Sequence, residues 1–407
     1  MFKPEIFRAY DVRGIYGQDF DAVFAQRLGG AVASYLRGGP LVVGRDFRRA
    51  SDDVAYAFID GAVHSGARVI DVGQVSSPQL YWAIGELGGA GIMVTASHNP
   101  ESYDGFKVIG RHGQIIDGGH IRQIYDGHPY HHHSGGGIDS EDIVPGYAAA
   151  VARSAGWSGQ EIQMAIDPPE PVRRALELIA PIAPDHGLAA RCDADGDRVA
   201  FYADGRPVAA DWIVLLLAQR LLYDPIVLDL RFSRAVFEQL NALNIRHHLS
   251  AVGRPAVTKA METSDAALGA EISGHFYFKE FGNRECPELV MLHIARIIQE
   301  GGKALSELIA PFLKYSKGEE IGIPIKDRKA GWSTIRKIQA HYQSCVSSRL
   351  DGLTIDCWAD QGWWFNIRPS NTEPLLRLVV EAKEKDLLEE KVREIRQFSD
   401  PLGGMGS

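Results

Sequence analysis

Strands that alternate with helices fill the first hundred residues, and this alternation constrains the fold more than any other feature of the sequence. Three apolar runs, at 41–44, 68–73 and 91–95, are separated by amphipathic segments at 19–36 and 51–64 and by a segment after Pro78. Strands alternating with helices of this length predict a mostly parallel α/β sheet. Ligands of such a sheet bind at the carboxyl ends of its strands, so residues that follow the apolar runs are the first candidates for a site.

The same rhythm returns in two later stretches and then stops. A segment rich in Gly and His at 126–142 predicts a linker, and its triplet His131, His132 and His133 is interpreted as solvated. After residue 350, three strand-like runs follow one another directly and predict an antiparallel sheet closed by a helix at 383–397. We therefore expect three related α/β domains with mixed sheets and a C-terminal α+β domain, with boundaries at 1–143, 144–204, 205–314 and 315–407.

Composition limits the partners. Lys and Arg number 43 against 52 for Asp and Glu, and the net charge of −9 argues against a nucleic-acid partner. The longest apolar run, at 212–218, is too short to cross a bilayer, and the N-terminus lacks an apolar signal segment. The four cysteines show no C-x-x-C pair, which argues against zinc and against a disulfide framework. We expect a cytoplasmic protein without a membrane partner that acts on a small molecule, as a monomer or weak homodimer.

The segment Thr95-Ala-Ser-His-Asn-Pro100 follows the apolar run GIMV directly. A serine at the carboxyl end of a strand lies at the mouth of the sheet, so Ser97 is a candidate nucleophile. The absence of G-x-S-x-G excludes the nucleophile elbow of α/β-hydrolases. Taken alone, the segment fits an ordinary Ser/Asn turn equally well.

The segment Asp193-Ala-Asp-Gly-Asp197 also ends an apolar run. Carboxylates at i, i+2 and i+4 of an extended backbone point the same way, and three such charges favour a cation between them. An EF-hand does not fit, because Arg198 stands at the sixth loop position and Asp204 at the twelfth. The supply of only three carboxylates favours Mg²⁺ over Ca²⁺, and the alternative is an exposed acidic turn.

Three weaker segments offer polar groups of the kind that bind sugars and phosphates. Glu271-Ile-Ser-Gly-His275 combines a carboxylate, a hydroxyl and an imidazole, while Arg368-Pro-Ser-Asn-Thr-Glu-Pro374 supplies the donors of a phosphate nest. Near the N-terminus, FRAYDVRG adds Arg8, Tyr10 and Arg13. Each also has an ordinary explanation, as a capped turn, an inter-strand turn or surface charge.

Together these segments resemble the α-D-phosphohexomutase superfamily, and most closely its phosphomannomutase/phosphoglucomutase members. FRAYDVRG, TASHNP followed by DGFK, DADGDR, GAEISGH and RPSNTEP occur in the family's order over nearly the whole chain. The resemblance implies four domains around a central cleft and a phosphoryl transfer between the 1- and 6-positions of a hexose phosphate. A hexose 1,6-bisphosphate would be the intermediate and primer.

The resemblance also implies residue roles. Ser97 would carry the phosphoryl group and, with Asp193, Asp195 and Asp197, hold Mg²⁺. Lys107, Arg13 and His275 are candidates for proton handling, and Arg198 with Lys107 would stabilise the transferring group. Substrate contacts would come from Arg8, Tyr10, His98, Arg231, Arg254, Glu271, Ser273, Arg368, Ser370, Asn371 and Thr372.

Some positions depart from the family pattern. The second domain is shorter by about one βαβ unit, roughly 30 residues, which weakens the predictions for the metal loop most. Arg231 and Arg254 stand where lysine and histidine are common, and Asp104 where asparagine is frequent. Ile272 favours mannose or glucose phosphates over glucosamine phosphate. The alternatives are a phosphoglucosamine mutase and a non-catalytic protein that binds or senses hexose phosphates.

Overall fold

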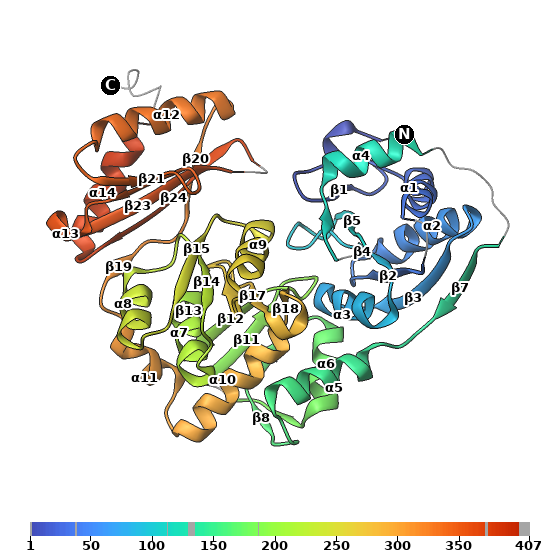
Figure 1. The fold of residues 1–407 in the computed structure, drawn as a ribbon, viewed down its shortest axis with the longest axis horizontal. Coiled ribbons are helices and arrows are strands. Elements are labelled where there is room, and N and C mark those ends of the chain that lie inside the picture. Colours follow the sequence, from blue (N-terminus) through green and yellow to red (C-terminus); the bar gives the residue numbers. More distant parts are fainter. Residues whose placement is uncertain are drawn as a thin grey trace. The chain divides into compact units, whose positions relative to one another are not determined.

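The computed structural model describes residues 2–36, 39–111, 113–128, 135–185, 187–370 and 373–398. The predictions for His131, His132, His133, Asn371 and Thr372 therefore fall outside the described residues. The chain forms two compact units, the first from Met1–Pro207 with Glu280–Gly301 and the second from Val208–Lys279 with Gly302–Ser407 (Figure 1). The four domain boundaries and the central cleft stay predictions.

Unit 1 begins with the predicted α/β sheet, whose central strands are parallel. Strands β2, β3, β4 and β7 run parallel, while β1 and β6 pair antiparallel with β5, which pairs antiparallel with β4. The order is β1-β5-β4-β2-β3-β7. The strands are β1 (Val12–Ile15), β2 (Leu41–Arg45), β3 (Arg68–Gln74), β4 (Ala90–Val94), β5 (Tyr103–Ile109), β6 (Ile115–Ile116) and β7 (Gly137–Ser140).

Alternate residues of these strands serve two faces of the sheet. Val43 and Ile92 join a fully buried core with residues of α1 (Ala22–Tyr35), α2 (Ser51–His64) and α4 (Gly118–Gly127). Gly44 and Gly91 instead lie against α3 (Ser77–Leu87) on the other face, where a Cβ on Gly91 would approach Ile84 to 2.1 Å. The helices thus cover both faces, which leaves the strand ends as the exposed edge.

Glycines allow α1 and α2 to touch along their backbones. A Cβ on Gly29 would lie 2.0 Å from the Phe58 carbonyl oxygen, and one on Gly61 would lie 1.8 Å from that of Gln26. Any side chain at either position would force the helices apart.

The rest of unit 1 contains the segment predicted to be a shortened second domain. It holds a mixed sheet in the order β13-β12-β11-β9 and the pair β10-β8. The elements are α5 (Val144–Ala155), β8 (Ile162–Gln163), β9 (Ala165–Asp167), α6 (Glu170–Ile179), β10 (Ile182–Ala183), β11 (Leu188–Cys192), β12 (Val199–Ala203), β13 (Arg206–Val208), β18 (Arg284–Glu285) and α10 (Pro287–Gly301).

Helix α10 arrives late in the chain and packs against α5 and α6. Arg296 donates to the carbonyl oxygens of Ala155 and Gly156 at 2.6 and 2.8 Å, and its guanidinium lies over the Trp157 ring. The Tyr147 hydroxyl donates to buried Glu288 at 2.8 Å. A helix from beyond residue 286 therefore completes the core beside the shortened domain.

Unit 2 contains a sheet whose order includes β15-β14-β16-β17 and whose first three strands are parallel. Helix α9 packs on β14, β15 and β16, with Val257 and Met261 fully buried. The elements are α7 (Ala210–Leu221), β14 (Ile226–Asp229), α8 (Arg234–Ala242), β15 (His247–Ser250), α9 (Arg254–Ser264), β16 (Leu268–Ala270), β17 (Phe276–Phe278) and α11 (Leu305–Ile309). Among the described residues of both units, short 3₁₀ helices lie at η1 (Pro4–Ile6), η2 (Lys279–Phe281) and η3 (Ala310–Phe312).

The C-terminal part of unit 2 confirms the predicted antiparallel sheet. The order is β19-β24-β23-β22-β21, with β20 also paired to β24, and every pair is antiparallel. One face is buried under the helices by residues that include Ile335, Ile338 and Ile395. The elements are β19 (Ser316–Lys317), β20 (Ile321–Pro324), α12 (Arg328–His341), β21 (Val346–Ser348), β22 (Leu353–Asp356), α13 (Trp358–Gln361), β23 (Trp363–Pro369), β24 (Leu375–Ala382) and α14 (Lys385–Gln397).

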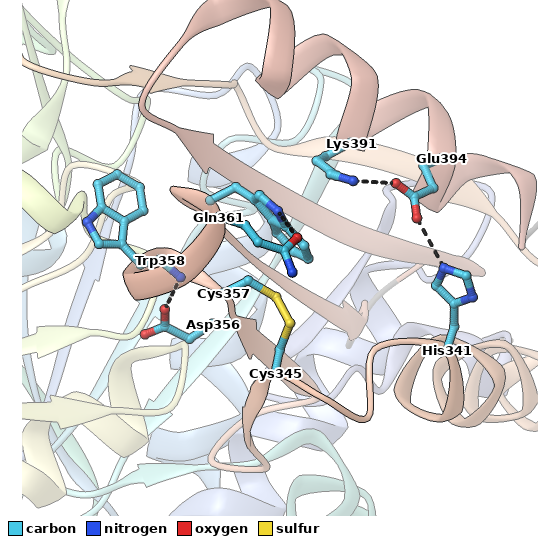
Figure 2. The surroundings of a disulfide bond; sticks show 9 residues. His341, Cys345, Asp356, Cys357, Trp358, Gln361, Lys391 and Glu394 are labelled. Atoms are coloured by element: carbon cyan, nitrogen blue, oxygen red, sulfur yellow. Dashed lines mark hydrogen bonds and ion pairs between the residues drawn. A yellow bond between two sulfur atoms is a disulfide. The ribbon is translucent and has the colours of Figure 1, made fainter.

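The expectation that the cysteines form no disulfide is wrong for one pair. Cys345 and Cys357 are bonded, with their Cα atoms 5.1 Å apart (Figure 2). Val346 pairs with Asp356 across β21 and β22, so the two cysteines are neighbours at the open end of this hairpin. Strand register rather than sequence spacing brings them together, which is why the spacing gave no sign of the bond. The expected cytoplasmic location stays a prediction.

No helix in the described part of the chain has the length and apolar character needed to cross a membrane.

Candidate functional site

Ser97 lies just beyond the carboxyl end of β4, in a turn that we call the serine loop (residues 95–103). Its backbone has φ of 51°, in the left-handed region that residues other than glycine seldom occupy. The Ser97 N–H donates to Thr95 Oγ1 at 2.8 Å, and Ser97 Oγ lies 3.4 Å from His98 Nδ1. The candidate nucleophile is thus buried and held in a conformation that needs support from its surroundings.

Two arginines supply that support. Arg48 donates to the carbonyl oxygens of Ser97, Asn99, Pro100 and Tyr103, all in the serine loop. Sequence reasoning missed Arg48. A signal existed, because Asp46 and Arg48 follow β2 just as the serine loop follows the adjacent parallel strand β4.

Arg13 supports the same loop from β1. Its guanidinium donates to Ala96 O at 3.2 Å and to Asn99 Oδ1 at 2.8 Å, and it forms a two-pronged ion pair with Asp11. Burial opposes the charge, but Asp11 outweighs burial and raises the pKa of Arg13 above its ordinary value. The predicted residues Arg8 and Tyr10 lie on the exposed segment before β1.

The three aspartates form the acidic loop (residues 193–198) between β11 and β12. One carboxylate oxygen from each of Asp193, Asp195 and Asp197 lies within 4.8 Å of the others. Gly196, at φ of +65°, closes the turn, and Asp193 Oδ1 accepts the N–H groups of Asp197 and Arg198. The local backbone therefore directs the three carboxylates to one point.

The donor set fits a magnesium ion. Asp193 Oδ2 and Asp195 Oδ1 are buried and accept no hydrogen bond from the residues that the structure describes. Burial, together with the charges of Asp197 and Asp195, raises the pKa of Asp193 well above its usual range. Crowded carboxylate oxygens without hydrogen-bond donors are the environment that a hard divalent cation neutralises.

Lys107, on β5, lies against the acidic loop. Its Nζ donates to Asp195 Oδ2 at 2.5 Å and to Asp197 Oδ2 at 2.9 Å, and it lies 3.3 Å from Ser77 Oγ. Burial alone would lower the pKa of Lys107, but Asp195 and Asp197 raise it well above its usual value.

Ser77, at the start of α3, is a second residue that sequence reasoning missed. Its hydroxyl donates to Asp195 Oδ2 at 2.7 Å, and its N–H donates to the Asp195 carbonyl oxygen at 2.8 Å. The capping box of Ser76 and Gln79 after the apolar run at 68–73 was a readable sign of polar groups at this strand end.

The serine loop and the acidic loop meet through their neighbouring residues. Arg198 Nη2 lies 3.2 Å from His98 Nδ1, and Arg198 Nε lies 3.5 Å from Asp193 Oδ2. Burial and the charges of Arg198 and Arg13 lower the pKa of His98 to about 4, so its ring is neutral at neutral pH. The residues predicted to carry the phosphoryl group and those predicted to hold the metal are therefore adjacent within one compact unit.

Unit 2 carries the predicted sugar-binding residues around Glu271. Its carboxylate accepts the Tyr277 hydroxyl at 2.6 Å and the Gly253 N–H at 3.1 Å, which fixes it beside the N-terminus of α9 at Arg254. Ser273 Oγ lies 2.9 Å from His275 Nδ1. Tyr277 follows the predicted segment in the sequence but was not singled out.

Arg231 and Arg368, both predicted to contact the substrate, share Glu320. Glu320 Oε2 lies 2.8 Å from Arg231 Nη1 and 3.5 Å from Arg368 Nη2. Burial opposes the charge of Arg231, but Asp229 and Glu320 raise its pKa above its ordinary value. The Nε of Arg368 is buried and donates to no acceptor in the described part of the chain. Sequence reasoning missed Glu320, which lies outside every motif. The predicted residue Ser370 directly follows Arg368 and Pro369.

Comparison with known proteins gives matches to three family models. They are described as phosphoglucomutase/phosphomannomutase alpha/beta/alpha domain I, over residues 4–128, alpha/beta/alpha domain III, over 209–315, and the C-terminal domain, over 321–398. A phosphomannomutase of Methanocaldococcus jannaschii is 30% identical, with 97% of each chain covered.

Solved structures agree in fold. A phosphoglucomutase/phosphomannomutase family protein from Burkholderia thailandensis has a TM-score of 0.84 at 23% identity, with 99% of each chain covered. N-acetylphosphoglucosamine mutase from Aspergillus fumigatus is more distant, at 12% identity in each of two structures. One is a complex with glucose 1,6-bisphosphate (TM-score 0.60, 97% and 95% covered), and the other holds GlcNAc-6P and magnesium (TM-score 0.57, 88% and 76% covered).

Three matched domains and a relative at 30% identity that spans nearly the full chain show that this protein belongs to the phosphoglucomutase/phosphomannomutase family of the α-D-phosphohexomutase superfamily.

Proposed function

We propose that this chain is a phosphohexomutase that moves a phosphoryl group between the 1- and 6-positions of mannose or glucose phosphates through Ser97. One observation carries the proposal. The buried Ser97 turn and three converging carboxylates are adjacent in a single compact unit, and Arg198 lies between His98 and Asp193. A hydroxyl beside a cation site is the arrangement that a phosphoserine intermediate requires.

The transfer takes place in two balanced halves. A free hydroxyl oxygen of the hexose phosphate bonds to the phosphorus of phospho-Ser97 as the bond to Ser97 Oγ breaks; the hydroxyl proton passes to a base, and Ser97 Oγ takes up a proton. The sugar then holds two phosphates. After the sugar turns round, Ser97 Oγ loses its proton to a base as it attacks the other phosphate and receives it, and the leaving sugar oxygen takes up a proton.

Charge near Ser97 stabilises both halves. Mg²⁺ held by Asp193, Asp195, Asp197 and an oxygen of phosphorylated Ser97 would supply positive charge where the equatorial oxygens gather negative charge. Arg198 and Lys107 add two fixed cations. The proton acceptor is one of Lys107, Arg13 and His275, and an imidazole such as that of His275 is the usual type of general base.

Unit 2 recognises the rest of the sugar phosphate. The carboxylate of Glu271 accepts hydrogen bonds from sugar hydroxyls, and the hydroxyl of Ser273 donates or accepts them. The phosphate that is not transferred is bound by Arg231, Arg254, Arg368 and Ser370. Since either end of the sugar occupies this place during the cycle, flexible charged donors suit it better than a fitted pocket. Arg8, Tyr10, His98, Asn371 and Thr372 keep their proposed substrate contacts. A hexose 1,6-bisphosphate is the proposed primer.

The test is a coupled assay that offers mannose, glucose and glucosamine 1-phosphates side by side with a trace of hexose 1,6-bisphosphate. We expect turnover of the first two and loss of at least about 10³-fold in Ser97→Ala. Ser102→Ala, an exposed serine of the same loop, is the matched control. Intact mass after priming should rise by about 80 Da, mapped to Ser97. Phosphate found only elsewhere, or an active Ser97→Ala, would contradict the proposal.

A further inference from the structure

The guanidinium of Arg48 is a buried charged group that the proposed mechanism does not use. Its side chain is only 5% exposed. Its donors reach four carbonyl oxygens, those of Ser97, Asn99, Pro100 and Tyr103. The planar guanidinium of this one residue therefore binds backbone carbonyl groups along the serine loop.

Asp46 fixes Arg48 in turn. Its carboxylate accepts the Arg48 backbone N–H and Nε, each at 3.1 Å. It also accepts the hydroxyls of Ser51, at 2.7 Å, and Thr95, at 2.6 Å. The Asp46 N–H donates to the Val94 carbonyl oxygen, so the ends of β2 and β4 are joined at this point.

The two sides of the Ser97 backbone are held by this one network. On the amino side, the Ser97 N–H donates to Thr95 Oγ1, whose own hydrogen goes to Asp46. On the carbonyl side, the Ser97 oxygen accepts from Arg48. Left-handed backbone at a serine persists only where the surroundings over-determine it, and these contacts do so.

We propose that Arg48 is a positioning residue for phosphoryl transfer. Arg48 does not touch the substrate, but it sets the backbone of Ser97 so that Ser97 Oγ faces the acidic loop. The inference rests on the proposed function of Ser97. It assigns the role to the fork shape of the guanidinium as well as to its charge. A lysine at this position has one nitrogen and cannot serve the same spread of carbonyl groups.

Arg45 offers a matched control. It belongs to the same strand end and is 8% exposed, and its side chain is ion-paired with Asp52 and Asp71, neither of which belongs to the serine loop. Arg48→Lys should lower kcat by about 10²-fold, the effect of a small misplacement of a reacting group, and leave KM within about threefold. Arg45→Lys should change kcat by less than about threefold. Equal losses in the two variants, or a fully active Arg48→Lys, would overturn the proposal.

A second pair of variants keeps the test decisive if Arg48→Lys does not fold. Thr95→Val removes the acceptor for the Ser97 N–H at nearly constant volume, whereas Thr95→Ser retains it. We expect Thr95→Val to lower kcat at unchanged KM and Thr95→Ser to restore most of it. An active Thr95→Val would count against the network.

Hydrogen exchange separates this inference from the proposed function. Amides of residues 95–103 should exchange faster in Arg48→Lys, or in Thr95→Val, than in Arg45→Lys. A wild-type protein inactive on all three hexose phosphates would refute the proposed function, while unchanged exchange in the serine loop would refute the positioning role.

Discussion

The serine loop and the Arg368 end of β23 both handle phosphate in the proposed cycle, yet they are built differently. In the serine loop, four carbonyl oxygens and the nucleophile's own N–H are already bonded. At Arg368, Nε has no acceptor among the described residues, and Nη2 lies 3.5 Å from Glu320 Oε2. The serine loop, where the phosphoryl group is transferred, therefore has a fixed geometry, whereas Arg368, which would bind the second phosphate, still has donors available for it. Such a division suits a site that must hold one end of the sugar and then the other.

Among the variants that test this comparison, the largest effect on kcat should come from the acidic loop. Asp195→Asn should lower kcat by at least about 10²-fold, because it removes a metal ligand and the partner of Lys107. Mg²⁺ at 100 times its Kd should stabilise the wild type by about 2.7 kcal/mol and leave the variant unchanged. Thermal unfolding with and without Mg²⁺ measures this without relying on activity. Asp167→Asn, an exposed carboxylate at the end of β9, is the control, and equal Mg²⁺ shifts in both variants would break the comparison.

A smaller effect, of a different kind, is expected at Arg368. Arg368→Lys should raise KM by about tenfold with little change in kcat, because it weakens charge-assisted hydrogen bonds to the phosphate that is not transferred. Steady-state kinetics with glucose 1-phosphate separates the two constants. Arg393→Lys, on the exposed face of α14, should leave both constants unchanged. A fall in kcat as large as that of Asp195→Asn would show that the two regions do not differ as described.

A substitution at Glu320 should lower KM, whereas Arg368→Lys should raise it. The carboxylate of Glu320 forms ion pairs with Arg231 and Arg368, so Glu320→Gln should leave both arginines available for phosphate. KM should then fall by about threefold, which corresponds to the free energy of a partly exposed ion pair. The exposed neighbour Glu319 supplies the control variant, Glu319→Gln. A higher KM in Glu320→Gln would mean that the carboxylate orients the arginines and does not compete with the substrate.

The last prediction concerns the pH dependence of stability and not turnover, at Asp104, which directly follows the serine loop. Burial and the nearby charge of Asp46 raise the pKa of Asp104 to about 7, from 3.8. The folded protein therefore holds a proton that the unfolded chain releases, so stability is lost as pH rises from about 4 through 7. Asp104→Asn should remove this loss, and its advantage over the wild type should grow between pH 5 and 8 by on the order of 1–3 kcal/mol.

Denaturant unfolding at several pH values gives this difference, and subtracting the two curves cancels other groups that titrate near neutrality, such as Glu288 with a pKa of about 7. Two parallel curves would show that Asp104 stays charged in the folded protein.

Some residues of the candidate site have positions that local pattern determines, and these positions were readable from the sequence. Ser97 and Asp193 follow apolar strands directly, so their place at strand ends was readable, and the antiparallel C-terminal sheet followed from consecutive strands. Contacts set by tertiary packing were not readable. Ser77 meets Asp195 from 118 positions away, and the Cys345–Cys357 bond depends on the register of a hairpin. Glu320 lies beside Arg231 only because the fold brings their segments together.

The late arrival of α10 has a consequence for how the protein is made. Apolar residues of this helix are buried in unit 1, against α5 and α6, although the chain has by then passed through part of unit 2. During synthesis the faces of α5 and α6 that it covers stay open until residue 301 has left the ribosome. A product cut short before that point would present these faces to chaperones and proteases, so the acidic loop and its supporting core depend on translation continuing well past the sequence that encodes them.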